Sequence, residues 1–360
     1  MKILPRYILQ ELWLPFLLSF LTLNFIFMGG YLVKAANLII GRGIPLFDTL
    51  LVLLLALPDM ISYTVPTGIL TAVLIVFGNL SQNNEIRALR ASGINPIYAI
   101  MPALVAGLAL SLCMLVFNDQ IATEASFLLR KTTKKMLIKH PMAMIEPGRF
   151  VNISDSVIFH TKKIVGNELR DIVAYENEGQ DLPVRTIIAE RGEVVSVNDN
   201  TEIQIRLYDG SISDADGKSV QSIQFKTYEF PTLGQEDIRN LQKKTRDNTL
   251  AELLLQSQNP KLEKETQIRI WSSFHERIAF ALGSFIFVFL GIPIAILVHR
   301  GEIVLSFGIA MGFASLYYIL FVGAKTVAHQ AILPTYVAFW LPNFLLLAVG
   351  AYLLRKSFNT

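Results

Sequence analysis

A short polar segment between two long apolar stretches carries the side chains best suited to a specific contact. It runs Leu80-Ser-Gln-Asn-Asn-Glu-Ile-Arg-Ala-Leu-Arg-Ala-Ser-Gly93. Asn83 can cap a helix, Glu85 falls in its first turn, and Gly93 followed by Pro96 can end it. The pattern therefore predicts one short helix that bears charges of both signs.

This segment also alternates bulky and small residues. Ile86, Leu89 and Arg90 recur at helical spacing, whereas Ala88 and Ala91 leave low relief on an adjoining face. Such a helix can insert into a groove on a soluble partner protein; an ordinary solvated connector is the alternative interpretation. The candidate contact residues are Glu85, Ile86, Arg87, Ala88, Leu89, Arg90, Ala91 and Gly93.

Residues that usually carry catalysis or bind metals are scattered. The five histidines form no HExxH motif, and the single cysteine, Cys113, excludes an intrachain disulfide and a cysteine-based metal site. The stretch 210–219 is superficially like a phosphate-binding loop, but its glycines, Gly210 and Gly217, are too far apart and it lies among predicted strands. We expect no catalysis, no metal site and no cofactor in this chain.

Asp59 is the one charged residue in the apolar stretch 49–78, and it follows Pro58. An acidic side chain within a membrane span is a candidate for function. The alternative is that Asp59 lies near the membrane interface or at a proline kink.

These residues are set in a chain with the composition of a membrane protein. Hydrophobic residues make up 52% of it and charged residues only 17%, against about 25% charged in soluble domains. Of the 61 charged residues, 46 lie between Asn118 and Arg277. This distribution excludes a soluble globular enzyme, a disordered chain and a nucleic-acid-binding protein, and it predicts one polar domain inserted into a membrane protein.

Six apolar stretches are each long enough to cross a hydrocarbon core of about 30 Å as a helix. They are 12–33, 49–78, 94–117, 278–298, 303–324 and 332–354. We therefore expect an α-helical integral membrane protein with six transmembrane helices. Its predicted parts are an N-terminal transmembrane half (1–117), a β-rich domain with connecting helices (118–270) and a C-terminal transmembrane half (271–360).

Lysine and arginine in the short loops predict the orientation. One side would carry Lys2, Arg6, Arg87, Arg90, Arg300, Arg355 and Lys356, and the other Lys34, Arg42 and Lys325. The first side should be cytoplasmic, which places both termini inside and the polar domain outside.

The polar block is predicted to be mostly β-strand. Alternating or β-branched patterns cover 156–164, 185–197, 202–208 and 219–230. Asp209-Gly210 is predicted to be a turn between two strands, and 235–258 to be a helix. Short strands at this spacing indicate a sandwich, jelly roll or open barrel. Ile203 and Ile223 are expected to face its apolar interior.

Several segments together resemble the lipopolysaccharide-export permeases, the LptF/LptG family. The segment 84–93 is similar to the motif between the second and third spans of those proteins. The other similar segments are Arg6-Tyr7-Ile8 with Glu11, Pro58-Asp59 with Pro66, Ile187-Ile-Ala-Glu-Arg-Gly-Glu193, His275-Glu276-Arg277 and Leu290-Gly-Ile-Pro293. The resemblance covers nearly the whole chain and extends to the plan of three spans, a domain and three spans.

This resemblance implies a permease of the bacterial inner membrane with a periplasmic β-jellyroll-like domain. It implies that two such permeases pair on a dimer of a cytoplasmic ATPase, which binds the ATP. Lipopolysaccharide would enter between the first and fifth spans and pass over the β-domain to periplasmic bridge proteins of LptC and LptA type. Whether the chain is LptF-like, LptG-like or one subunit in both roles stays open.

The resemblance also implies a basic residue close to the lipid phosphates at the outer end of the first span, where Lys34 stands. Lys325 ends the fifth span on the same predicted side and is likewise a candidate for contact with the lipid phosphates. The alternative for both is membrane topology or snorkelling of the ammonium group to the interface. Glu276 and Arg277 are expected to pair with each other or to cap the fourth span.

Two other functions stay open. A secondary transporter would need ionisable groups near the membrane midplane and paired broken helices, for which Asp59 and the prolines offer the support. A membrane anchor that presents a β-domain without transporting anything is the other.

Overall fold

The computed structural model describes residues 3–41, 44–139, 145, 147–152, 157–166, 168–176, 185–197, 202–215, 220–230, 241–259, 262–299 and 301–359. The chain forms two compact units. The helical unit comprises residues 1–31, 55–127 and 243–360, and the sheet unit comprises residues 32–54 and 128–242.

Within the described residues, six helical stretches are long and apolar enough to cross a membrane, as predicted. Their helices are α1 (Ile3–Ala36), α2 (Leu46–Gln82), α4 (Ile97–Val116), α8 (Lys264–Ala281), α9 (Gly283–Val298), α10 (Ile303–His329) and α11 (Thr335–Asn359). Helices α8 and α9 together form the fourth span. Most extend beyond the predicted apolar ranges, because helix hydrogen bonding continues past the end of the hydrophobic stretch. The third span continues from α4 through a π-helical turn, η2 (Phe117–Ala122), into α5 (Thr123–Lys139).

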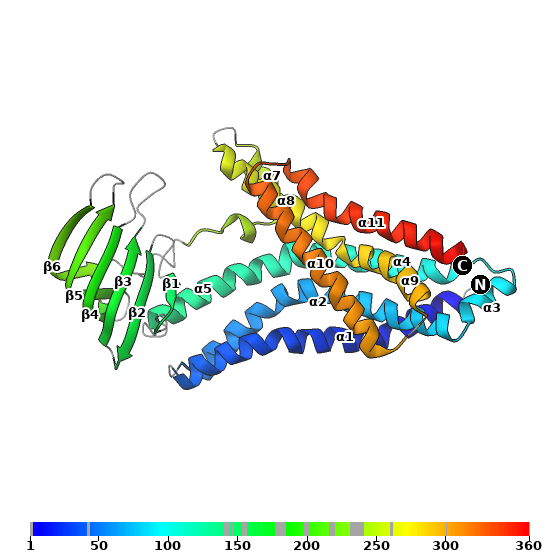
Figure 1. Cartoon of the computed structure of the whole chain (residues 1–360), viewed down its shortest axis with the longest axis horizontal. Helices are drawn as coiled ribbons and strands as arrows, with labels where there is room; N and C mark the ends of the chain where they lie inside the picture. The colour runs from blue at the N-terminus through cyan, green and yellow to red at the C-terminus, as the bar shows by residue number, and fades with distance from the viewer. Residues whose placement is uncertain are drawn as a thin grey trace. The chain divides into compact units, whose positions relative to one another are not determined.

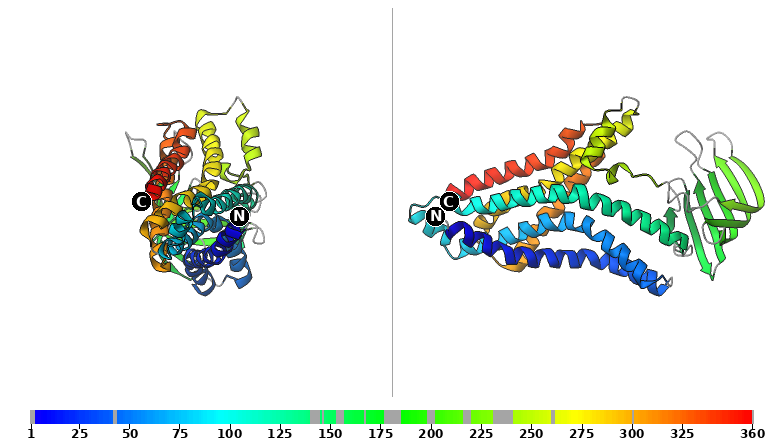
Figure 2. Two further views of the ribbon diagram at one scale, coloured as in Figure 1. Left: turned by 90° about the vertical axis from the view of Figure 1, so that its right-hand side faces the viewer. Right: turned by 180° about the vertical axis from the view of Figure 1, so that it is seen from behind.

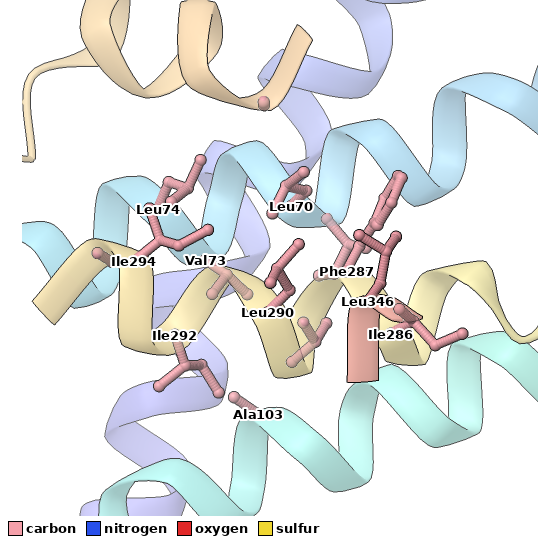
Figure 3. Packing of buried hydrophobic residues seen from close by; sticks show 14 of the residues in the cluster. Leu70, Val73, Leu74, Ala103, Ile286, Phe287, Leu290, Ile292, Ile294 and Leu346 are labelled. Atoms are coloured by element: carbon pink, nitrogen blue, oxygen red, sulfur yellow. The ribbon is translucent and has the colours of Figure 1, made fainter. Parts of the chain in front are cut away.

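Helix α2 lies at the centre of the helical unit and α1 and α10 at its margin (Figures 1 and 2). In the most apolar 18 residues of each helix, 89% of the residues of α2 are buried, against 11% of those of α1 and 22% of those of α10. Figure 3 shows Leu70 and Val73 of α2 packed with Phe287 and Leu290 of α9 in the main hydrophobic cluster. The apolar outer faces of α1 and α10 are therefore available to lipid or to another protein.

Small residues allow the central helices to approach closely. A Cβ atom at Gly291 of α9 would come within 2.8 Å of the Leu70 side chain, and one at Gly107 of α4 within 2.9 Å of Val288. Gly29 and Gly30 of α1 have no atom within 4 Å of such a Cβ position. Close packing through small residues in the described part of the unit therefore centres on α9, at its contacts with α2 and α4.

The inserted β part is confirmed as an antiparallel sheet. Its strands, within the described residues, are β1 (Phe150–Asn152), β2 (Val157–Val165), β3 (Glu168–Glu176), β4 (Arg185–Val197), β5 (Glu202–Ala215) and β6 (Val220–Phe230). Each described strand pairs with the next along the chain. One face carries a hydrophobic cluster that includes Phe159, Leu207 and Phe230.

The prediction of a turn at Asp209-Gly210 is wrong, because both residues lie within β5. Asp209 has φ of 51° and Asp171 in β3 has φ of 54°, so both strands kink without reversing. The buried side chains switch parity there, from Leu207 to the partly buried Ile212 in β5. A kink carries the same Asp-Gly signature as a turn, which explains the error.

The predicted helix over 235–258 is shorter in the structure. Helix α7 covers Leu250–Ser257, and the range 231–240 lies outside the described residues. Thr249 fixes its start: the Thr249 hydroxyl accepts from the backbone N–H of Glu252, and the Glu252 carboxylate accepts from the N–H of Thr249. The hydrogen bond from Thr249, aided by Lys243, lowers the pKa of Glu252.

Ile223 lies opposite Ile212 in the ladder, and Ile212 packs against the hydrophobic cluster. Ile223 is nevertheless 65% exposed. The side chain of Ile203, the other residue expected to face the interior, lies outside the described part of the structure.

Candidate functional site

The segment between α2 and α4 forms the helix α3 (Glu85–Ala91). Asn84, rather than Asn83, precedes its first turn, and its side chain makes no capping hydrogen bond to the helix backbone. Asn84 and Gly93 both have left-handed backbone angles, with φ of 59° and 74°. Helix α3 is thus a single short unit with a sharp change of chain direction at each end.

The predicted contact residues divide between two faces of α3. Ile86 is only 6% exposed and belongs to the main hydrophobic cluster with Ile8 of α1. The opposite face is exposed and consists of Arg87, Ala88, Ala91 and Gly93, while Leu89 is partly buried. The exposed face has low relief because two of its residues are alanine.

Two charged residues attach the flanks of α3 to other helices. The Arg90 guanidinium donates to the backbone carbonyl of Ser357 in α11 at 2.8 Å. The Tyr7 hydroxyl of α1 donates to the Glu85 carboxylate at 3.5 Å. A cavity of about 320 Å³, lined mainly by apolar residues of α1, α2 and α3, lies beneath this second contact.

A second, polar cavity of about 280 Å³ lies elsewhere in the helical unit. Three ion pairs border it, and they join elements that are far apart in sequence. Asp59 pairs with Arg246 at 2.7 Å, Asp119 with Arg277 at 2.7 Å, and Glu276 with Lys325 at 2.9 Å. Glu276 and Arg277 therefore pair with other residues, and the expectation that they pair with each other is wrong.

Asp119 joins three elements at this cavity. It lies in the π-helical turn η2, and such turns are frequent at functional sites. Its carboxylate accepts from Arg277 of α8 and, also at 2.7 Å, from the backbone N–H of Leu250, the first residue of α7. Sequence reasoning missed both Asp119 and Arg246. Asp119 stands just after the apolar stretch 94–117, which is a weak signal, whereas Arg246 lies within the polar block and carries no such signal.

The three ion pairs differ in exposure. The side chains of Arg277 and Asp119 are 9% and 14% exposed, whereas those of Lys325 and Glu276 are 45% and 34% exposed, and those of Arg246 and Asp59 are 65% and 38% exposed. An exposed pair contributes about 0–1 kcal/mol of stability. The Arg246 and Lys325 cations can therefore exchange their carboxylate partners for another anion at small cost.

Lys34 lies in α1, in the part of the chain that belongs to the sheet unit, and its side chain is outside the described structure. Lys325 belongs to the helical unit. Among the described residues no group of three or more histidine, cysteine, aspartate or glutamate side chains is placed to hold a metal ion.

Comparison with known proteins decides the family. The family model described as lipopolysaccharide export system permease LptF/LptG matches residues 6–356. The chain belongs to this family. An uncharacterized protein of Rickettsia prowazekii (strain Madrid E) is 24% identical over 250 residues, which is 68% of each chain. The chain is thus a multi-pass membrane permease of a lipopolysaccharide export system, with its β-sheet inserted between the third and fourth spans.

Proposed function

We propose that this permease is the transmembrane subunit of an ATP-driven transporter. It extracts lipopolysaccharide from the inner membrane and passes it to a periplasmic bridge of LptC and LptA type. The observation that carries the proposal is the exposed, low-relief face of α3, in a chain that belongs to a lipopolysaccharide export family.

The exposed face of α3 suits a cytoplasmic ATPase dimer as its partner. Ala88 and Ala91 allow a groove to close over the helix, and Arg87 supplies a charge at its edge. Buried Ile86 holds the helix on the core, so a force applied to the outer face moves helices rather than a loose connector. ATP hydrolysis takes place in the partner, and this chain needs no cofactor.

The basic residues near α3 support the predicted orientation in the membrane. The beginning of α1 and the end of α11 lie beside α3 (Figures 1 and 2). Five of the basic residues predicted to be cytoplasmic lie in these three segments, namely Arg6, Arg87, Arg90, Arg355 and Lys356. Both termini are then cytoplasmic, and the sheet unit is periplasmic.

The lipid and the second permease use other surfaces. The exposed apolar faces of α1 and α10 suit a second permease of the same family and the acyl chains that enter between the two. The Lys325 ammonium, which is partly exposed at the polar cavity, contacts a lipid phosphate in exchange for Glu276. The apolar face of the sheet then receives the acyl chains.

A secondary transporter is less well supported. Its main candidate for a proton-binding group is Asp59. The Asp59 carboxylate is engaged instead in an ion pair, in which it accepts a hydrogen bond from Arg246 at 2.7 Å.

Purification and reconstitution test the proposal. The tagged chain should co-purify with an ATPase and a second permease. The complex in vesicles of phospholipid and lipopolysaccharide should release lipopolysaccharide to a soluble bridge protein only when ATP is supplied. Release that follows a proton gradient without ATP would support the secondary transporter, and ATPase binding without release would support the anchor.

A further inference from the structure

The contact between α3 and α11 has the geometry of a helix cap. Ser357 lies in the last turn of α11 and is 2% exposed. Carbonyl groups in the last turn of a helix lack partners within the helix, and they carry its negative dipole end. The Arg90 guanidinium donates a hydrogen bond to the Ser357 carbonyl at 2.8 Å and places a positive charge at this negative helix end. Helix α3 and the end of α11 are therefore joined by a charge-assisted hydrogen bond.

The other end of this stretch of α11 is joined in the same way to α8 and α10. The Asn343 amide donates to the backbone carbonyl of Ala279, in the last turn of α8, at 2.8 Å. Its carbonyl oxygen accepts from the Tyr317 hydroxyl of α10 at 2.9 Å. Asn343 and Tyr317 are 2% and 1% exposed, so neither contact competes with water.

The α-helix between these two joints is suited to transmit movement. Asn343 and Ser357 are fourteen residues apart, which is about 21 Å of helix. The proline in α11, Pro342, precedes this stretch and does not interrupt it. Gly350 allows it to lie directly on Phe289 of α9, because a Cβ atom there would come within 2.8 Å of that ring.

The two helices joined at Asn343 carry the two members of one ion pair. Glu276 stands three residues before Ala279 on α8, and Lys325 stands eight residues after Tyr317 on α10. Their charged groups meet at the polar cavity at 2.9 Å. A shift of α11 that moves α8 relative to α10 therefore changes this pair.

We propose that α11 is a rigid link by which displacement of α3 opens the Glu276–Lys325 ion pair, with Arg90 and Asn343 as the positioning residues at its ends. The inference rests on the proposed function, in which an ATPase displaces α3. Of the two polar contacts of α3 described above, the one with α1 is the weaker, since the Tyr7 hydroxyl and the Glu85 carboxylate are 3.5 Å apart and exposed.

Spin labels on α8 and α10 can report this movement directly. Cys113 is the one native cysteine and is exposed, so a Cys113→Ser chain can carry labels at Lys264→Cys of α8 and Ile319→Cys of α10, both exposed positions. With the ATPase bound, nucleotide should change the distance between the labels in the parent chain. Arg90→Gln and Asn343→Leu should each abolish most of that change while the ATPase still binds.

Transport gives the second readout. Arg90→Gln should lower the lipopolysaccharide released per ATP hydrolysed about tenfold, the effect of one lost charge-assisted hydrogen bond. Arg90→Lys should recover part of it. Arg355→Gln is the matched control, because Arg355 is an exposed arginine of the same last stretch of α11, and it should behave like the parent.

Hydrogen exchange of the isolated chain in detergent covers the case in which a variant fails to assemble. In Arg90→Gln, amides at the end of α11 should exchange faster than in the parent and in Arg355→Gln. Unchanged label distances and unchanged coupling in Arg90→Gln would overturn the inference. A parent chain that binds no ATPase would count against the proposed function instead.

Discussion

The α3 end of the helical unit and its polar cavity are held together by different kinds of contact. At the α3 end, a buried isoleucine and hydrogen bonds to backbone carbonyls join the helices. Around the cavity, ion pairs between side chains join α2, α8, α10, η2 and the segment before α7. Carbonyl caps have fixed partners, whereas exposed ion pairs can change partners, so the first region suits the transfer of force and the second the exchange of anions.

The largest expected effect comes from breaking the most buried ion pair of the cavity, between Asp119 and Arg277. Arg277→Ala leaves the Asp119 carboxylate largely buried without its guanidinium, and should lower the free energy of unfolding by about 3 kcal/mol. Arg269→Ala, in the same helix, breaks an exposed pair with Glu265 and should cost less than about 1 kcal/mol. Denaturant unfolding of both variants in detergent measures the difference. Equal losses would mean that Asp119 and Arg277 belong with the exchangeable pairs.

The outward face of α3 should be sensitive to size rather than to stability. Ala91→Trp fills the low-relief face that we assign to the ATPase, and it should lower ATPase co-purification by about tenfold or more, since one misfit at a packed contact costs over 1 kcal/mol. Unfolding should be unaffected, because the position is exposed. Arg355→Trp, a change at an exposed position of α11, is the control. Normal ATPase binding by Ala91→Trp would remove α3 from the interface.

Hydropathy alone located the six spans, because each is a continuous apolar stretch long enough for a bilayer. Strand β3 was not predicted, since its buried positions run Leu169, Ile172 and Ala174, and the kink at Asp171 breaks the alternation. The same kind of kink made Asp209-Gly210 look like a turn. Local patterns fail where two neighbouring residues point to one side of a strand.

The contacts of the two sites could not be derived from sequence. Asp59 and Arg246 are 187 residues apart, and their meeting depends on how α2 packs beside the segment before α7. The partner of Arg90 is a backbone carbonyl, and because every residue has one, the amino-acid sequence does not indicate which carbonyl Arg90 contacts. The exposed face of α3 was easier to predict, because small and charged residues recur at helical spacing.

A charge swap separates the structural role of Lys325 from its proposed contact with lipid. Lys325→Glu places two carboxylates side by side at the cavity, and it should lower export several-fold while costing about 1 kcal/mol of stability or less. The double variant Glu276→Lys/Lys325→Glu restores the ion pair in reverse. It should recover stability and should not recover export, because the cation has moved to α8. Recovery of both would assign Lys325 to structure alone.

Lys34 should give the smallest effect, and it tests whether the contact with lipid phosphates extends beyond the polar cavity. A lysine at the membrane edge holds its ammonium at headgroup level while its stem follows the helix, and one such contact is worth about 1 kcal/mol after screening. Lys34→Arg should export like the parent, since a lysine acts as a point charge that arginine can replace. Lys34→Asp should reduce both export and crosslinking to lipopolysaccharide at equal protein levels, without abolishing either. If Lys34→Asp exports as well as the parent, Lys34 serves topology and anchoring, and the recognition of phosphate is confined to the cavity.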